Sequence, residues 1–137
     1  MIVKSWKKAS NVLEALFSNL ISNALKFSKE IAPCIIQIST KIVNAEEASK
    51  YVSNAESKTF HRITVADNGI GFNDENAEKI FQIFQRLHGR YEYDGTGIVL
   101  ALCKKIVLNH GGDIYATSEE GNGASFHVLL PVTAMNN

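Results

Sequence analysis

The chain has 137 residues, of which 45% are hydrophobic and 9% aromatic. This is the size and composition of one folded domain, so we expect a single unit over residues 1–137. Fourteen basic and fourteen acidic side chains give a formal net charge of zero. Global charge therefore gives no support for a nucleic-acid or membrane-surface partner, and any anion site must be local.

The sequence favours a cytoplasmic location without direct membrane contact. No apolar run approaches the ~20 residues of a membrane-spanning helix, and the N-terminus lacks the apolar stretch of a signal peptide. This expectation leaves open a membrane-bound parent protein. Cys34 and Cys103 are too few and too far apart for a disulfide framework, which favours two buried free thiols in a reducing compartment.

The strongest helical pattern covers residues 11–27. Ser10 or Asn11 is suited to cap its start, and the apolar residues recur at helical spacing: Leu13, Leu16, Phe17, Leu20, Ala24 and Phe27. Asn19, Asn23 and Lys26 share one stripe about a quarter turn from the apolar centre. This stripe would line a cleft and offer amide oxygens to a metal ion and an ammonium to phosphate; the alternative is a solvated polar face.

Residues 34–43 and 60–66 alternate as two strands of a hairpin, with a polar excursion between them that has room for a short helix. The second strand runs into Asp67-Asn68-Gly69-Ile70-Gly71. Its glycines allow a sharp turn and close approach of backbone to a ligand, and its Asp can accept a hydrogen bond from an exocyclic amine. The alternative is an ordinary Asp-Asn-Gly turn.

Residues 73–84 are helical in part, and the charged, aromatic stretch up to Asp94 suits a lid that carries Arg86 or Arg90 toward phosphate; the alternative is a surface loop. Gly95-Thr96-Gly97 opens a helix over 96–109, whose N-terminal amides favour an anion. The spacing matches neither a P-loop nor a dinucleotide fingerprint. His110-Gly111-Gly112 ends that helix.

Strands over 113–118 and 124–130, joined by a Gly-rich turn, close the chain. Because strands follow one another rather than alternate with helices, we expect an α+β fold, a two-layer sandwich of a mixed, largely antiparallel sheet and about three helices. No histidine has metal spacing. His61 and His127 are most simply surface or satisfied core residues.

Taken in order, these segments resemble the ATP-binding catalytic domain of sensor histidine kinases, a branch of the superfamily that includes gyrase and a heat-shock chaperone. The resemblance runs from about Val12 to Pro131 and implies the Bergerat ATP-binding fold. The corresponding segments are the N box (19–28), first Gly box (67–72), F box (81–88), second Gly box (95–100) and last Gly box (121–126).

The resemblance implies ATP and Mg²⁺ as cofactors. Asn23 would ligate Mg²⁺, Lys26 would contact phosphate, and Asp67 would bind the adenine amino group with the Ser125 hydroxyl beside it. Arg86 would serve the lid, and amides from Gly95 to Ile98 the phosphates. The residues assigned to the nucleotide are Asn23, Lys26, Asp67, Gly69, Gly71, Gly95, Thr96, Gly97, Ile98 and Ser125.

Asn19, Lys26 and Arg86 are the expected catalytic residues. Asn19 stands where ATP-hydrolysing relatives carry a Glu, and a carboxamide is a poor base, so the resemblance implies phosphoryl transfer to a histidine rather than hydrolysis. The phosphoacceptor helix is absent, so the acceptor would lie on a separate or excised dimerisation domain that serves a response regulator, and the isolated domain would be monomeric. Val99 replaces a usual Gly; the alternative is a degenerate, non-catalytic interaction module.

Overall fold

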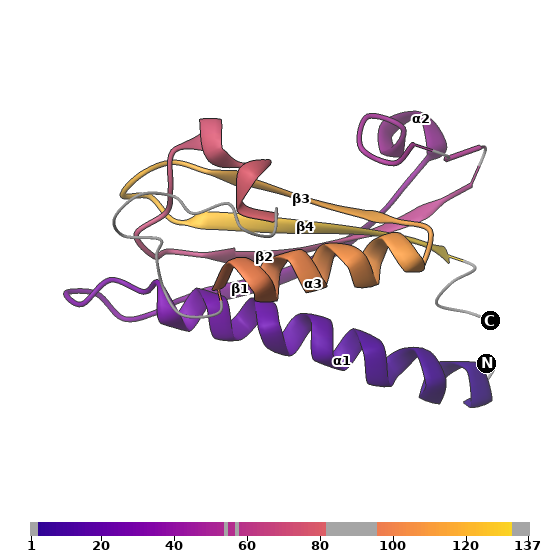
Figure 1. The fold of residues 1–137 in the computed structure, drawn as a ribbon, viewed down its shortest axis with the longest axis horizontal. Helices are drawn as coiled ribbons and strands as arrows, with labels where there is room; N and C mark the ends of the chain where they lie inside the picture. The colour runs from indigo at the N-terminus through magenta and orange to yellow at the C-terminus, as the bar shows by residue number, and fades with distance from the viewer. Residues whose placement is uncertain (1–2, 54, 57, 82–95, 133–137) are drawn as a thin grey trace.

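The computed structural model describes residues 3–53, 55–56, 58–81 and 96–132. Its sheet has four antiparallel strands in the order β1-β2-β4-β3. Two long helices lie against one face of this sheet (Figure 1). The α+β, two-layer prediction is confirmed. The strands are β1 (Ile36–Val43), β2 (Phe60–Asp67), β3 (Asp113–Ser118) and β4 (Ala124–Pro131), and the helices α1 (Val3–Lys26), α2 (Ala45–Ala48) and α3 (Thr96–Asn109).

Besides shifts of one or two residues at the ends of strands, two elements differ from the sequence prediction. Helix α1 begins at Val3 rather than at residue 11, because residues 4–9 are mostly good helix formers and interior Ser10 and Asn11 cost only a few tenths of a kcal/mol each. In the described part of 73–84, only two 3₁₀ turns form, η1 (Asp74–Asn76) and η2 (Lys79–Phe81). Asn73 accepts a hydrogen bond from Glu75 N–H, and side-chain bonds of this kind compete with a regular helix.

The core lies between the two helices and the sheet. Leu16 and Leu20 of α1 have no exposed surface, and neither does Cys103 of α3. Strand alternation directs Val65 and Phe126 to this side of the sheet, where they join the same cluster. The helix α3 ends as predicted: Gly111 has φ +81°, and Gly112 N–H donates to Val107 O at 3.0 Å.

The site segments gather at one end of the molecule. The end of α1, the start of α3, the turn after β2 and the β3–β4 turn all lie there (Figure 1). The beginning of α1 and the end of β4 lie at the opposite end (Figure 1). No described helix is long and apolar enough to cross a membrane.

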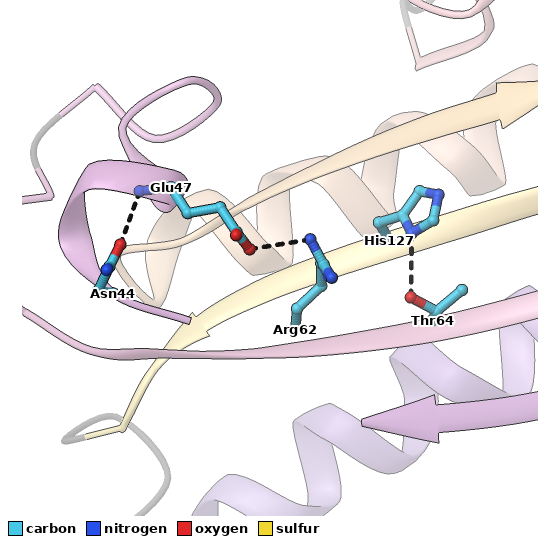
Figure 2. Close-up of polar contacts among 5 residues, drawn as sticks. All are labelled: Asn44, Glu47, Arg62, Thr64 and His127. Carbon is cyan, nitrogen blue, oxygen red and sulfur yellow. Dashed lines mark hydrogen bonds and ion pairs between the residues drawn. The ribbon is translucent and has the colours of Figure 1, made fainter. Parts of the chain in front are cut away.

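The other face of the sheet is partly covered by α2, which packs with Val52 over Phe60 and Leu129. Asn44 caps α2 by accepting a hydrogen bond from Glu47 N–H at 2.9 Å. Glu47 in turn pairs with Arg62 of β2 at 3.1 Å, as Figure 2 shows. The side chains of α2 thus attach the excursion between β1 and β2 to the sheet.

His127 joins three strands on this second face. One ring nitrogen, Nδ1, hydrogen-bonds Thr64 Oγ1 of β2 at 3.0 Å (Figure 2), and Nε2 bonds Thr117 Oγ1 of β3 at 3.0 Å. The ring also stacks on Tyr115, with centroids 4.5 Å apart, and Tyr115 stacks on Tyr51 at 3.7 Å. His127 is therefore a satisfied structural residue, as the sequence predicted.

We expect His127 to make the fold less stable in mild acid. Burial, with the positive charge of Arg62, lowers the pKa of His127 from its usual 6.5. At a pH between the folded-state pKa of His127 and 6.5, the unfolded chain therefore binds more protons than the folded chain. The contribution of the neutral ring to the free energy of unfolding is fully present above pH 6.5 and is lost as pH falls through the folded-state pKa. Urea unfolding at pH 7.5 and 5.5 should show this loss.

The matched variants are His127→Gln and His61→Gln, which change neighbouring strands of the sheet in the same way. His127→Gln should unfold with a smaller difference in free energy between the two pH values than the wild type. His61→Gln should retain the wild-type difference. An undiminished difference in His127→Gln would show that other groups carry the acid sensitivity.

Candidate nucleotide-binding site

The polar stripe of α1 lies at the border of the core. Asn19 and Asn23 are half-buried, next to fully buried Leu20 and nearly buried Ala24, while Lys26, the last residue of the helix, is exposed. The placement of the two amides at the core border is confirmed. The stripe can therefore offer two amide groups to a ligand and a cation at its outer end.

Asn19 also contacts α3. Burial raises the pKa of the Cys103 thiol to about 11, although a hydrogen bond with Asn19 opposes this shift. The thiol is therefore neutral near pH 7 and chemically inert. Both cysteines are free, and Cys103 is buried as expected, but Cys34 is partly exposed, because it lies in the connection before β1 rather than inside the strand.

Asp67 ends β2 with one carboxylate oxygen fixed. Its Oδ1 accepts hydrogen bonds from Gly69 N–H at 2.8 Å and from Ala124 N–H at 3.3 Å. Burial raises the pKa of Asp67 above its usual 3.8, against the opposing effect of these two donors. Both of these donors use Oδ1, and no described residue is seen to donate to Oδ2.

The turn after Asp67 packs directly on the end of α1. Ile70 N–H donates to Phe27 O at 2.9 Å, and a Cβ added at Gly69 would lie 2.4 Å from that same carbonyl oxygen. Only Gly fits at this approach. The N box helix and the Asp67 turn, 41 residues apart between residues 26 and 67, are thereby joined at the backbone.

The β3–β4 turn packs on the other side of the Asp67 turn. Gly121 N–H donates to Ile70 O at 2.7 Å. The Ser118 hydroxyl accepts from Phe72 N–H and donates to Gly123 O, both at 2.8 Å. Ser118 was not singled out from the sequence, because a serine at the end of a strand carries no pattern that distinguishes it from any other turn residue.

Ala124, rather than Ser125, lies directly beside Asp67. Ala124 supplies the N–H to Asp67 Oδ1 and belongs to the helix-side core, whereas Ser125 pairs with Ala66 and Thr117 in the next position of β4. Successive strand residues face opposite sides, so Ser125 lies on the side of His127. It still borders a cavity of about 300 Å³ that Asp67 also lines. The predicted role of its hydroxyl beside the base is thus not supported by this placement.

The second Gly segment is described only from Thr96 onward. Thr96, Gly97 and Ile98 begin α3, as predicted. Gly95, and Arg86 with its predicted role in a lid, lie outside the described residues. Val99 is half-buried within α3 and packs against the core. Its methyl groups are therefore accommodated by the helix and the core.

Comparison with known proteins decides the family. Residues 9–134 match the family model described as histidine kinase-, DNA gyrase B- and HSP90-like ATPase. The chain belongs to this ATPase family. The resemblance seen in the sequence to sensor histidine kinase catalytic domains is thereby confirmed.

Curated relatives of this ATPase domain are much longer proteins. Cyanobacterial phytochrome A from Nostoc sp. is 43% identical over 123 residues, which cover 90% of this chain and 14% of that protein. Sensor histidine kinase WalK from Bacillus subtilis is 38% identical over 118 residues, covering 85% of this chain and 17% of WalK. The chain thus spans about one seventh of the phytochrome's length.

Solved structures confirm the fold of the ATPase domain. The catalytic domain of histidine kinase ThkA, in a nucleotide-free form, matches with a TM-score of 0.61 and 25% identity over 88% of this chain and 67% of that one. Full-length ShkA, solved with AMPPNP, matches with a TM-score of 0.64 and 23% identity, over 88% of this chain and 21% of ShkA.

Proposed function

We propose that this chain binds ATP with Mg²⁺ and donates the γ-phosphoryl group to a histidine on a separate or excised dimerisation domain, in a two-component system that ends at a response regulator. The observation that carries the proposal is Asp67. Two backbone N–H groups hold its Oδ1, which leaves Oδ2 for the exocyclic amino group of adenine. An enclosed acceptor of this kind selects a base that donates a hydrogen bond.

The phosphates would lie between α1 and α3. Lys26 ends α1, and Thr96, Gly97 and Ile98 supply the first amides of α3, where a helix of 14 residues favours an anion. The placement of these groups at the same end of the molecule as Asp67 supports one continuous nucleotide site (Figure 1). We expect Arg86 to act from the lid and the Gly95 amide to add a further contact to the phosphates.

Asn23 fits Mg²⁺ by the chemistry of its donor atom. A half-buried amide oxygen is a hard ligand, and Mg²⁺ is commonly held by one or two protein oxygens together with substrate phosphates and water. When bound, Mg²⁺ neutralises charge on the phosphates. Asn23 would hold it, and Lys26 would add a second positive charge beside it.

Asn19 supports phosphoryl transfer rather than hydrolysis. Its carboxamide cannot take a proton from water near neutral pH, so the site has no strong base at the position where the ATP-hydrolysing relatives carry Glu. Transfer to histidine needs none, because the imidazole nitrogen attacks phosphorus directly as the bond from the γ-phosphorus to the bridging oxygen breaks and ADP leaves. The site would then promote transfer by positioning the reacting groups and by neutralising the charge on the phosphates.

Val99, which replaces a usual Gly, is the feature that favours the alternative of a degenerate, non-catalytic module. Because the residue is helical and packs against the core, its side chain has a structural place in α3. The packing therefore favours the kinase over the interaction module.

A calorimetric titration with ATP, with and without Mg²⁺, tests the proposal. We expect binding that Mg²⁺ strengthens, and Asn23→Ala should weaken the Mg²⁺-dependent part by about tenfold, the scale of one lost ligand to a charged centre. Asn73→Ala is the control, since the Asn73 side chain bonds to Glu75 N–H within its own turn. No affinity for ATP up to millimolar concentration would reject the kinase proposal.

A further inference from the structure

Asn68 uses its whole side chain to hold another segment. Its Oδ1 accepts a hydrogen bond from Ile35 N–H at 2.8 Å, and its Nδ2 donates to Pro33 O at 2.9 Å. The Asn68 backbone N–H also donates to Ile35 O at 3.2 Å. Three bonds thus attach the turn after β2 to residues 33–35, which precede β1.

The same turn is attached to Phe27 at the other end of that connection. Ile70 N–H donates to Phe27 O, and Gly69 leaves no room between the two backbones. The connection from α1 to β1 therefore touches the turn twice, once through backbone at Phe27 and once through the Asn68 side chain. Gly69 lies between these two attachments, and Asp67 immediately precedes Asn68.

The Asn68 side chain restrains the turn that follows the Asp67 carboxylate. Without it, Ile35 N–H and Pro33 O would have to bond to water, and the turn would be attached on that side by the Asn68 backbone alone. The Gly69 N–H that holds Asp67 Oδ1 belongs to the same turn. Freedom in this turn would therefore misdirect Oδ2.

We infer that Asn68 is a positioning residue for the nucleotide base, which orients Asp67 by clamping its turn to residues 33–35. The inference rests on the proposed ATP site. It assigns a role to a side chain that does not itself touch the ligand. The role concerns the base and not the phosphates.

The test compares Asn68→Ala with Asn44→Ala. Both variants lose an Asn side chain that bonds to a backbone N–H, but the partner of Asn44 is Glu47 N–H in the helix that Asn44 caps. Asn68→Ala should lower the affinity for ATP about tenfold, and the affinity for ADP by the same factor because both carry the same base. Asn44→Ala should bind both nucleotides like the wild type.

Asn68→Asp is a second variant with nearly the same shape, in case Asn68→Ala does not fold. It keeps the acceptor for Ile35 N–H but places a carboxylate oxygen against Pro33 O, so its affinity should fall at least as far as that of Asn68→Ala. Hydrogen exchange supplies a readout that needs no nucleotide: the Ile35 amide should exchange faster in Asn68→Ala and not in Asn44→Ala.

Each of the following results would overturn the positioning role of Asn68. Wild-type affinity in Asn68→Ala, or a tenfold loss for ATP with none for ADP, overturns the positioning role and leaves the ATP site standing. Equal losses in Asn68→Ala and Asn44→Ala reduce the effect to stability and also overturn it. A wild-type chain that binds no nucleotide overturns the proposed function, and the role of Asn68 with it.

Discussion

Replacing Asp67 by Asn is expected to weaken ATP binding on the order of 50-fold, because a charge-assisted hydrogen bond to the adenine amino group is lost. The fold should survive, since an amide oxygen can still accept from Gly69 N–H and Ala124 N–H. The preference for ATP over GTP should shrink as well, because the Asn amide can donate to the guanine oxygen. Competitive titration with both nucleotides measures the two effects.

Asp113→Asn is the matched control for this substitution. Asp113 also accepts a backbone hydrogen bond, from Ile114 N–H at 2.7 Å, but it begins β3, at the opposite end of that strand from Ser118. Its replacement should leave nucleotide affinity unchanged. Equal affinities in Asp67→Asn and Asp113→Asn would mean that the base does not bind at Asp67.

Replacing Gly123 by Ala should destabilise the fold by about 4 kcal/mol, which is at the upper end for single substitutions. Gly123 has φ +85°, and a Cβ there would lie 2.0 Å from Asp67 O, so the β3–β4 turn and the end of β2 must separate. The free energy of unfolding in urea measures this loss. Since Asp67 would shift with its backbone, nucleotide affinity should fall too.

Gly121 lies in the same turn and distinguishes the two causes of the loss, the positive φ and the close contact with Asp67 O. It has the same φ of +85°, but a Cβ there would have nothing within 4 Å. Gly121→Ala should therefore lose only the backbone preference, about 1–2 kcal/mol. If the two variants were equally destabilised, the close contact with Asp67 would not be the cause.

The spacing of apolar residues predicted the arrangement of the elements well. Leu16 and Leu20 recur at helical spacing, so the buried face of α1 follows from sequence, and with it the border position of Asn19 and Asn23. The start of α1 did not follow, because Ser10 and Asn11 have the chemistry of a cap in any context. Only the surrounding helix formers and the rest of the fold decide whether a residue caps or continues.

The contacts within the site were harder to predict. The sequence predicts only that Asn68 belongs to an Asp-Asn-Gly turn. Its hydrogen-bond partners at Pro33 and Ile35 are more than thirty residues away in the sequence. Ser125 was placed beside Asp67 by the resemblance, but a strand has a period of two residues, so a difference of one position changes the face. Motifs locate such a site, while hydrogen bonds between segments far apart in the sequence decide which atoms face it.

The positions of the start of α1 and the end of β4 bear on how this domain can be joined to other segments. The start of α1 and the end of β4 lie at the same end of the molecule, and the Asp67 turn and the β3–β4 turn lie at the far end (Figure 1). Segments joined at both junctions would leave from the same side, so neither has to pass the mouth of the site. We therefore expect that a neighbouring module attached at this end can be exchanged without reshaping the loops at the far end.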